Sequence, residues 1–410
     1  MINMGTAYII GAFRSPIGKF MGKLSGFSAV GIAAEVVKGT FEMLGTVDKK
    51  LVDEAIVGNV LSAGLGQNPA KQVVMHSGLQ KSVPTLNINM VCASGLKAIA
   101  LAAQAIENEN ADIVLAGGME SMTTAPHTVT GARKFRKFGN IGLNELYDYA
   151  ARTNTEYSLI DEMINTGLWD CYADLHMGTI AEAIGVKDKI TREEQDEFAY
   201  RSHMKAIAAT DSGKFAEEIV PITLGDGSVF SQDEGIRRDT SLQKLSQLKP
   251  AFMEGGTVTA GNSSQLSDGA AFSIIASEKA VSEHGFRPMA KIEAYADSGI
   301  DPNWYGLSPI DSMNNAMAKS GHKLDEMDII EINEAFCVQT LGVVKEMDID
   351  MSKLNVNGGA IALGHPIGAS GAILVATLVH ALKDRKNELG IVSLCHGGGG
   401  SSSMVISRVG

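Results

Sequence analysis

The sequence predicts an α/β protein made of two similar halves with an inserted segment between them. Three observations support this prediction. Short strand-like runs alternate with helical stretches, one turn, helix and strand unit occurs twice, and a polar helical segment separates the two copies. The length of 410 residues suits two domains, or one duplicated unit with an excursion, better than a single core.

The alternation of strands and helices begins near the N-terminus. Residues 7–10 and residues 55–57 are rich in apolar and β-branched side chains, which is typical of strands. An apolar helix is predicted near residues 93–107, and a further strand at residues 112–116 ends at Gly117-Gly118. This order of elements is typical of α/β proteins.

An internal repeat is the strongest sign of the overall organisation. Cys92-Ala93-Ser94-Gly95 opens the first apolar helix, and Gly368-Ala369-Ser370-Gly371 opens a second one at residues 372–382. Each helix is followed by a polar link, a strand and a pair of glycines, Gly117-Gly118 in the first copy and Gly397-Gly398 in the second. We therefore expect two similar halves about a pseudo-twofold axis, with a functional site shared between their loops.

Between the two copies, we interpret residues 121–250 as an inserted domain. This part is polar and helical, and at residues 191–209 Thr191 is placed to cap a helix and Glu194 to complete a capping box. We expect three parts: an N-terminal half at residues 1–120 that is completed by residues 251–270, an inserted loop domain at 121–250, and a C-terminal half at 271–410.

The composition argues against several classes of protein. The formal net charge of −12 argues against a nucleic-acid groove or an anionic membrane surface as partner. No run approaches about 18 apolar residues, and no basic stretch precedes an apolar run at the N-terminus, so we expect neither a membrane helix nor export. The cysteines form no CxxC pair, which argues against a zinc site or a disulfide scaffold and favours the reducing cytoplasm: Cys92, Cys171, Cys337 and Cys395.

Two residues could form a nucleophile and its base. Cys92 stands before a predicted helix, where the helix dipole favours the thiolate over the thiol; the alternative is a buried structural cysteine. His365 lies in a glycine-rich stretch, and Pro366 restricts it to extended conformations. A histidine can deprotonate a nearby thiol, although a histidine in a surface turn would fit the same pattern.

Two further strand ends hold polar candidates. Cys395 follows the predicted strand of the second copy and precedes the glycine run 397–400, whose N–H groups could bind an oxyanion; the alternative is a flexible turn. Asn333 follows a strand-like run at residues 328–332 and would start a helix. It could therefore be an N-cap or hold a water molecule.

These motifs, in this order, resemble the thiolase family over essentially the whole chain. The matching segments are Cys92-Ala93-Ser94-Gly95-Leu96-Lys97-Ala98, Gly117-Gly118-Met119-Glu120-Ser121-Met122, Asn333-Glu334-Ala335-Phe336, residues 358–371 and residues 395–399. The resemblance implies two βαβαβαββ halves in α-β-α-β-α layers, with a loop domain inserted in the first half. It also implies a homotetramer, a dimer of dimers, that closes through the loop domain.

The resemblance implies a role for each polar candidate. Cys92 would attack a thioester carbonyl and become acylated, and His365 would activate it. Cys395 would take a proton from the α-carbon of a second acyl-CoA. His365 and a water held by Asn333 would stabilise the enolate oxygen, and the backbone amides of Cys92 and Gly397 would stabilise the tetrahedral adduct.

The implied reaction joins two acetyl-CoA molecules into acetoacetyl-CoA and CoA by a ping-pong mechanism, with coenzyme A as substrate and product and with no cofactor or metal. His176-Met177-Gly178-Thr179 resembles the motif of members that act on short acyl chains. Arg237 matches a position near the nucleotide end of CoA. The other matches line the pantetheine and acyl channel, or pack the core in the alternative interpretation: Leu168, Met177, Phe252, Ser264, Ala335 and Phe336.

Three alternatives stay open. A degradative 3-ketoacyl-CoA thiolase would use longer substrates, and His176 argues against it. A decarboxylating ketosynthase-like enzyme normally lacks a second cysteine, so Cys395 argues against it. A non-catalytic thiolase-like carrier or scaffold would be expected to lose the catalytic residues. His396, the run 400–403 and the long stretch 131–157 with its basic cluster depart from the family pattern.

Overall fold

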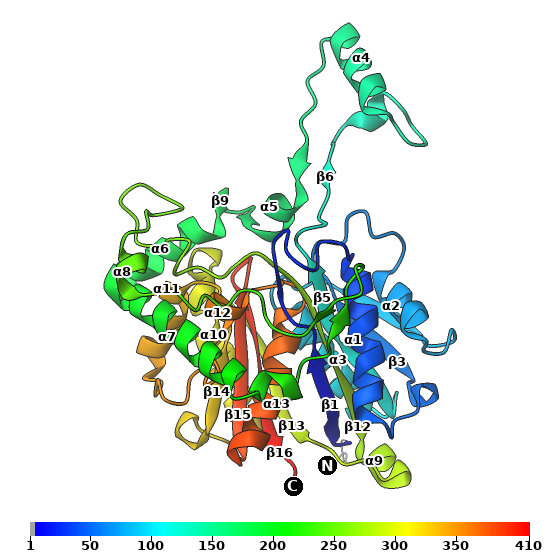
Figure 1. Ribbon diagram of the computed structural model, residues 1–410, viewed down its shortest axis with the longest axis vertical. Coiled ribbons are helices and arrows are strands. Elements are labelled where there is room, and N and C mark those ends of the chain that lie inside the picture. Colours follow the sequence, from blue (N-terminus) through cyan, green and yellow to red (C-terminus); the bar gives the residue numbers. More distant parts are fainter. Residues whose placement is uncertain (1–4) are drawn as a thin grey trace.

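A ten-stranded sheet runs through the computed structural model, which describes residues 5–410 (Figure 1). Along the sheet the order is β4-β3-β5-β12-β1-β13-β16-β15-β14, and β2 pairs with β12. The bounds of these strands are β1 (Ala7–Arg14), β2 (Gly18–Lys19), β3 (Glu54–Gly58), β4 (Thr85–Ile88), β5 (Ile113–Ser121), β12 (Ser267–Ser277), β13 (Ala290–Gly299), β14 (Ile329–Ile332), β15 (Leu389–His396) and β16 (Gly400–Arg408).

The sheet consists of two halves with the same strand plan. In the N-terminal half β3 pairs in parallel with both β4 and β5, and in the C-terminal half β14 pairs in parallel with β15. The other pairs of this sheet are antiparallel. The halves join in the middle, where β1 and β13 pair through Tyr8 with Lys291 and through Ile9 with Ala290. The predicted α/β class and duplication are confirmed.

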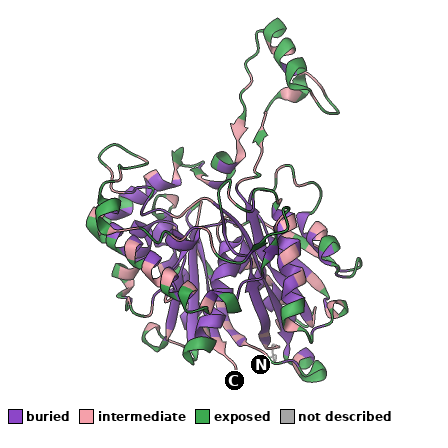
Figure 2. Ribbon diagram, in the orientation of Figure 1, coloured by how far each residue is buried: buried purple, intermediate pink, exposed green. Residues whose placement is uncertain are grey.

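Helices on both sides of the strands produce five layers. α3 (Ser94–Glu107) and α13 (Ser370–Arg385) pack against each other and against strands of both halves, so they form the middle layer. α1 (Ala29–Leu44) and α2 (Pro69–Ser77) cover the outer face of the N-terminal half, and α10 (Pro309–Ser320) covers that of the C-terminal half. Because helices lie on both faces, β5 and β12 are buried along their whole length (Figure 2). The predicted α-β-α-β-α order is confirmed.

The glycines of the two repeated turns bring the starts of the middle helices together. A Cβ atom on Gly95 would lie 2.9 Å from the backbone nitrogen of Ala372, and one on Gly371 would lie 2.5 Å from that of Leu96. In a close-packed interior such contacts would force the helices apart. The repeat therefore sets how closely the Cys92 turn approaches its counterpart.

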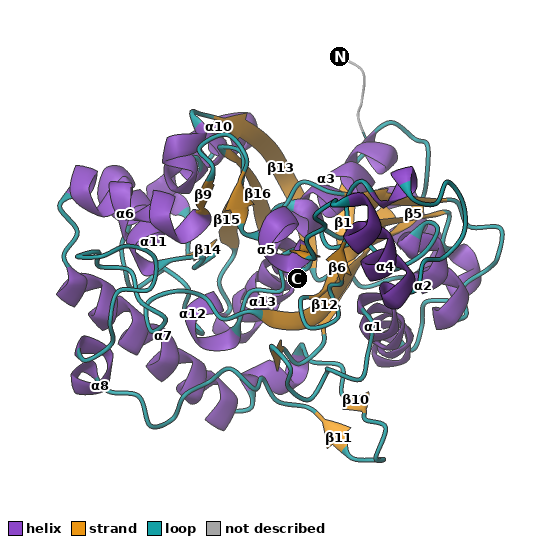
Figure 3. Ribbon diagram, turned by 90° about the horizontal axis from the view of Figure 1, so that it is seen from above, coloured by secondary structure: helices purple, strands orange, loops and turns teal. Residues whose placement is uncertain are grey.

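The segment between β5 and β12 forms the inserted loop domain. Among the described residues, the remaining α-helices and strands, inside and outside this domain, are β6 (His127–Thr128), α4 (Leu143–Thr153), β7 (Ile160–Asp161), α5 (Glu162–Gly167), β8 (Trp169–Asp170), β9 (Leu175–His176), α6 (Met177–Asp188), α7 (Arg192–Asp211), β10 (Ile222–Thr223), β11 (Val229–Phe230), α8 (Leu242–Ser246), α9 (Glu278–His284), α11 (Cys337–Met347) and α12 (Ala360–Leu363). α6 and α7 pack on α11, on the side of the molecule away from α1 and α2 (Figure 3). The predicted capping box of Thr191 and Glu194 is present at the start of α7. Within residues 5–410 no helix is long and apolar enough to cross a membrane.

One part of the loop domain stands away from the body, and we call residues 129–159 the arm. β6 and β7 pair as a short antiparallel ribbon, and the arm, which includes α4, projects from it (Figure 1). Most of the arm is exposed (Figure 2), and the exposed fractions are 84% for Phe138 and 74% for Tyr147. The long stretch 131–157, which contains the basic cluster, thus lies in a separate protrusion.

Two predicted boundaries differ from the structure. β5 does not end at Gly117-Gly118 but continues to Ser121, because this stretch keeps pairing with β12. β12 continues to Ser277 and pairs with β5 and β1 of the N-terminal half. The boundary expected between residues 270 and 271 therefore falls inside one continuous strand.

Candidate active site

Cys92 stands in a tight turn between β4 and α3. Val91, directly before it, has a φ of 47°, a left-handed value that is rare for a β-branched residue and persists only where the surroundings impose it. The Ser94 hydroxyl stabilises the turn, because it donates to the Val91 carbonyl at 2.7 Å and accepts from the Met90 N–H at 2.9 Å. The turn thus presents the Cys92 sulfur ahead of the helix.

His365 meets Cys92 from the C-terminal half. Its Nε2 lies 3.3 Å from Cys92 Sγ, which is hydrogen-bond distance for sulfur. The loop is fixed on both sides of the imidazole: the His365 N–H donates to the Gln265 carbonyl at 3.0 Å. Gly364 has a φ of 116°, and a Cβ atom there would lie 2.2 Å from Ser267 Oγ, so this close approach requires glycine. The structure brings the predicted pair together.

Ser370 determines the tautomer of His365. The Ser370 hydroxyl donates to the Pro366 carbonyl at 2.9 Å, and its oxygen lies 2.5 Å from His365 Nδ1. A hydroxyl has one proton, so the Ser370 oxygen must accept from Nδ1–H, and the lone pair of the neutral ring then lies on Nε2, facing Cys92. Sequence reasoning missed Ser370, although it occupies the same place in the second turn as Ser94 in the first.

Burial keeps both members of this pair neutral at rest. It raises the pKa of the Cys92 thiol to about 12, although the N–H groups of Cys92 and Gly397 act in the opposite direction. Burial also lowers the pKa of the His365 imidazole to about 4. Burial therefore opposes the predicted preference for the thiolate in the resting site, because it penalises the charged form of the sulfur. The proton has to move to His365 as the sulfur attacks.

Cys395 is the second thiol of the site. It lies near the end of β15 and is buried, and burial together with the nearby Cys92 raises its pKa well above the ordinary value. Two residues later, the N–H of Gly397 lies close enough to the Cys92 sulfur to favour its charged form, as does the N–H of Cys92 itself. Two backbone donors therefore converge on the nucleophile, which suits the stabilisation of an oxyanion.

His396 shows how one departure from the family pattern is accommodated. Its Nδ1 donates to the Gly397 carbonyl at 2.7 Å, which fixes the backbone next to the Gly397 N–H. The ring covers Gly400, where a Cβ atom would lie 2.2 Å from His396 Nε2. The following residue, Ser401, pairs with Cys395 across the strands. An imidazole at position 396 thus requires glycine at position 400.

Asn333 lies beside the imidazole. It is buried at the end of β14, and its Nδ2 lies 3.4 Å from His365 Nε2. The predicted N-cap is wrong, because α11 begins only at Cys337. Glu334 holds the intervening stretch outside the helix, since its carboxylate accepts from three donors in other segments: Ser202, Asn355 and Ile361.

A pocket in front of His365 has an aromatic wall. His176 stacks on Phe252 with ring centres 4.7 Å apart, and Phe252 meets Phe336 edge-on at 5.8 Å. His176 Nδ1 accepts from the Gly178 N–H at 3.1 Å and burial lowers the pKa of the imidazole, so the proton of the ring is on Nε2. Three further residues of the lining were predicted from the sequence: Leu168, Arg237 and Ser264. Others in the lining were not predicted, among them Lys19, Met122, Met163, Ile164, Ala251, Leu266 and Ile367.

Two predicted channel residues stand outside this lining. Met177 is buried at the start of α6, and its carbonyl accepts from the Tyr305 hydroxyl at 3.1 Å. Ala335 is buried as well, and its carbonyl accepts from the Ser264 N–H at 3.0 Å. The Met177 side chain lies next to Gly397, because a Cβ atom on Gly397 would be 3.9 Å from Met177 Sδ.

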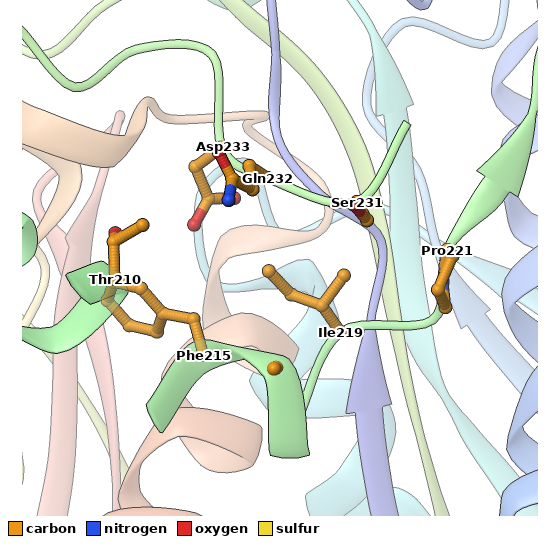
Figure 4. A pocket seen from close by; sticks show the side chains of 8 residues that line it. Thr210, Phe215, Ile219, Pro221, Ser231, Gln232 and Asp233 are labelled. Carbon is orange, nitrogen blue, oxygen red and sulfur yellow. The ribbon is translucent and has the colours of Figure 1, made fainter. Parts of the chain in front are cut away.

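A second hollow has a different character (Figure 4). Its carboxylate, Asp233, accepts from the Arg14 guanidinium at 2.7 and 2.9 Å and from the Ile17 N–H at 2.8 Å. Arg14 is fully buried and also pairs with Glu218. The charge of Asp233 is thus used in ion pairs and hydrogen bonds within the protein. The apolar side chains Phe215 and Ile219 also line the hollow, which therefore has a structural role.

The site beside Cys92 has the parts needed for acyl transfer. A thiol nucleophile lies beside a neutral imidazole that can accept its proton, and two backbone N–H groups converge on it. A second thiol lies nearby, and Lys19 and Arg237 give the pocket lining positive charge. This combination suits a thioester with an anionic tail.

Comparison with known proteins agrees with this chemistry. The chain matches the thiolase N-terminal domain over residues 7–279 and the thiolase C-terminal domain over residues 286–408. It is 44% identical over 405 residues to an acetyl-CoA acetyltransferase of Allochromatium vinosum, with 98% of each chain covered. Its fold is similar to that of human mitochondrial 3-ketoacyl-CoA thiolase in complex with CoA, with a TM-score of 0.92, 38% identity and coverage of 99% of this chain and 98% of that chain.

A second solved structure gives the same result. The Bacillus anthracis acetyl-CoA acetyltransferase is 37% identical, with a TM-score of 0.92 and coverage of 100% of both chains. The duplicated fold agrees with the match to two thiolase domains and with the similarity to both solved structures. The chain belongs to the thiolase family.

Proposed function

We propose that this protein is an acetyl-CoA acetyltransferase, which condenses two acetyl-CoA molecules to acetoacetyl-CoA and CoA and also catalyses the reverse thiolysis. The observation that supports it most is the 3.3 Å approach of His365 Nε2 to Cys92 Sγ. This pair occurs in a chain that is 44% identical over almost its full length to an acetyl-CoA acetyltransferase.

In the first half-reaction Cys92 becomes acetylated. Its sulfur attacks the carbonyl carbon of acetyl-CoA while His365 Nε2 takes the thiol proton. The N–H groups of Cys92 and Gly397 stabilise the negative charge that forms on the carbonyl oxygen. The bond between carbon and the CoA sulfur then breaks, and the departing thiolate takes the proton of Cys395, so that CoA leaves as a thiol.

In the second half-reaction Cys395 is the base. Its thiolate takes a proton from the α-carbon of a second acetyl-CoA, and protonated His365 and a water held by Asn333 stabilise the enolate oxygen. The α-carbon attacks the carbonyl carbon of acetyl-Cys92, and acetoacetyl-CoA forms. The expelled Cys92 sulfur recovers its proton from His365, while Cys395 keeps the proton it took, so the resting site is restored.

We propose a short acyl chain as substrate. The support is the stack of His176 on Phe252 beside the apolar lining of the pocket. A degradative 3-ketoacyl-CoA thiolase is the second candidate, because the human mitochondrial 3-ketoacyl-CoA thiolase shares the fold. We expect kcat/KM for thiolysis of acetoacetyl-CoA to exceed that of a ten-carbon 3-ketoacyl-CoA by at least about tenfold. Equal values would assign the protein to the degradative group.

The proposed reaction is tested directly with acetyl-CoA as the only substrate. We expect acetoacetyl-CoA and CoA to form in equal amounts, and peptide mass spectrometry should find one acetyl group, on Cys92. Acetyl-CoA should also protect Cys92 from a thiol alkylating agent, since both reagents use the same sulfur. An acetyl group on another residue, or none at all, would contradict the assignment of the nucleophile.

We propose that the chain forms a homotetramer built from two dimers. Two exposed features support this: β4 is an edge strand on which Leu86 is 43% exposed, and the arm exposes Phe138 and Tyr147 beside its basic cluster. Aromatic and arginine side chains are favoured at interfaces. Light scattering should show a tetramer, and replacement of residues 134–156 by a short Gly/Ser linker should leave active dimers. If the variant with the linker still formed a tetramer at low micromolar concentration, the proposed role of the arm would be contradicted.

We also propose a cytoplasmic location. The four cysteines are free, although oxidising compartments favour disulfides. Cell fractionation with an antibody against the protein tests this, and recovery with a secreted or membrane fraction would contradict it.

A further inference from the structure

We propose that Glu120 is a positioning residue that holds His365 and the wall of the acyl pocket in place relative to each other. The inference rests on the proposed function, because it concerns the same site. Glu120 lies near the end of β5 and is fully buried. Buried carboxylates are rare unless they are well hydrogen-bonded, so the partners of Glu120 indicate what it does.

The Glu120 carboxylate joins the two halves of the molecule. Oε1 accepts from the Asn59 side chain at 2.7 Å and from the Leu61 N–H at 3.1 Å. Oε2 accepts from the Val60 N–H at 3.1 Å and from the Gly368 N–H at 3.0 Å. The first three donors belong to the loop after β3, and Gly368 belongs to the turn that opens α13. One side chain thus fixes two loops that come from opposite halves.

On the C-terminal side the clamp reaches the base. Gly368 comes three residues after His365 and two residues before Ser370, whose hydroxyl sets the tautomer of the imidazole. In the first turn of the repeat the corresponding N–H is that of Cys92, which lies close to its own sulfur and favours the charged form of the thiol. In the second turn the N–H at the helix start holds the Glu120 carboxylate instead, as such donors favour an anion.

On the N-terminal side the clamp reaches the acyl pocket. Val60 and Leu61 form an apolar cluster with Met163 and Ile367, and Cys92 packs against this cluster. Met163 and Ile367 also line the pocket. A change at the clamp would therefore alter the space around the acyl chain as well as the position of the base.

The clamp requires a carboxylate rather than an isosteric amide. Each oxygen accepts two hydrogen bonds, whereas the amide nitrogen of a glutamine can only donate. In Glu120→Gln the new amide nitrogen, itself a donor, would face two buried N–H donors that lose their acceptor. The free-energy cost of these unpaired donors is large enough to move the loops apart. Burial raises the pKa of Glu120 to about 7, although the N–H groups of Leu61, Val60 and Gly368 favour the ionised form.

The test compares Glu120→Gln with Glu331→Gln in the full-length protein. Glu331 is an equally buried carboxyl on β14 whose oxygens have no hydrogen-bond partner among residues 5–410, so it controls for the replacement of a buried carboxyl group by an amide where no clamp is lost. We expect Glu120→Gln to lower kcat for acetoacetyl-CoA thiolysis by about 10- to 100-fold, since a small misplacement of the base is enough. KM for CoA should change little, because the His176 and Phe252 wall is not part of the clamp.

A second readout separates positioning from general destabilisation. The ratio of kcat/KM for acetoacetyl-CoA to that for a six-carbon 3-ketoacyl-CoA should fall in Glu120→Gln, because Leu61 loses its anchor. If Glu120 had a merely structural role, Glu120→Gln would lower kcat/KM for both substrates equally and would also lower Tm. This result would overturn the proposal. So would wild-type kcat with an unchanged ratio. Glu331→Gln should leave the ratio as in the wild type.

Glu120→Asp keeps the inference testable if Glu120→Gln does not fold. The shorter carboxylate keeps its charge but cannot reach both loops, so we expect an intermediate kcat and a shifted ratio, and unchanged values would overturn the proposal. Failure of the proposed function would appear in the wild-type protein as absent acetoacetyl-CoA thiolysis. The same variants would then be compared on the acyl chain that the wild type prefers.

Discussion

In the first turn of the repeat Ser94 closes the turn on itself, whereas in the second turn Ser370 reaches out to a catalytic group. Ser94 donates to the Val91 carbonyl and accepts from the N–H of Met90. Ser370 makes the same kind of bond to the Pro366 carbonyl but uses its acceptor capacity on the imidazole of His365. One local structure therefore supplies the nucleophile in one half and orients its base in the other.

The two turns also differ in what their first N–H group binds. The N–H of Cys92 lies close to the sulfur, beside which the carbonyl oxygen of a bound thioester would become negative during acyl transfer, and the N–H of Gly368 is occupied by the Glu120 carboxylate. The difference teaches that a helix start is an anion site in both halves. The chain fills this site with its own side chain in one half and leaves it for the substrate in the other.

Removal of the nucleophile from the first turn should have the largest effect on the rate of the reaction. Cys92→Ala leaves neither turn with a thiol, so we expect condensation of acetyl-CoA to fall by at least about 10⁴-fold. The protein should remain folded, because the change is small and Cys92 is only partly buried. Intact mass spectrometry should find no added acetyl group. Acetylation of this variant at Cys395 would show that either thiol can act as the nucleophile.

Removal of the second thiol separates the two half-reactions. In Cys395→Ala we expect condensation and thiolysis to fall by about 10²- to 10⁴-fold, because proton transfer at the α-carbon is lost. Acetylation of Cys92 should still occur, as seen by mass spectrometry after incubation with acetyl-CoA. Unimpaired formation of acetoacetyl-CoA would rule out Cys395 as the base.

The serines of the two turns provide a matched pair of variants. Ser370→Ala frees the tautomer of His365 and should lower kcat by roughly 10- to 100-fold. Ser94→Ala removes hydrogen bonds within its own turn and should cost about 1 kcal/mol of stability with a smaller effect on kcat. Steady-state kinetics and thermal melting of both variants check this. Equal losses of kcat would mean that Ser370 only holds its turn.

A further expected effect concerns stability at low pH. Burial lowers the pKa of His365 to about 4 in the folded protein, against about 6.5 for an exposed histidine. As the pH falls from about 6.5 to 4, the unfolded chain binds a proton that folded His365 does not, so this group lowers the free energy of unfolding by at most about 3 kcal/mol.

Urea denaturation of wild type and His365→Asn measures this contribution. The loss of stability between pH 7 and pH 4.5 should be smaller in His365→Asn than in the wild type. If both proteins lost the same amount, the imidazole would be able to accept a proton inside the folded site, and the neutral resting pair would have to be abandoned.

Much of the fold and the central pair of the site were predictable from the sequence. The repeated turn of small residues, the alternation of strands and helices and the capping box at Thr191 depend on neighbours within a few positions. Cys92, His365 and Cys395 were identified because each stands at the end of a predicted strand or beside glycines, a local signal, and in the order of a known family.

Other features depended on contacts between distant parts of the chain and were decided only by the tertiary structure. The Glu120 clamp arises where the two halves meet, and no residue type marks it in advance. The N-cap interpretation of Asn333 failed because Glu334 is bound by distant segments. The neutral state of Cys92 likewise follows from burial, since the cost of a charge depends on everything packed around it, whereas a local pattern specifies only the turn in which the thiol stands.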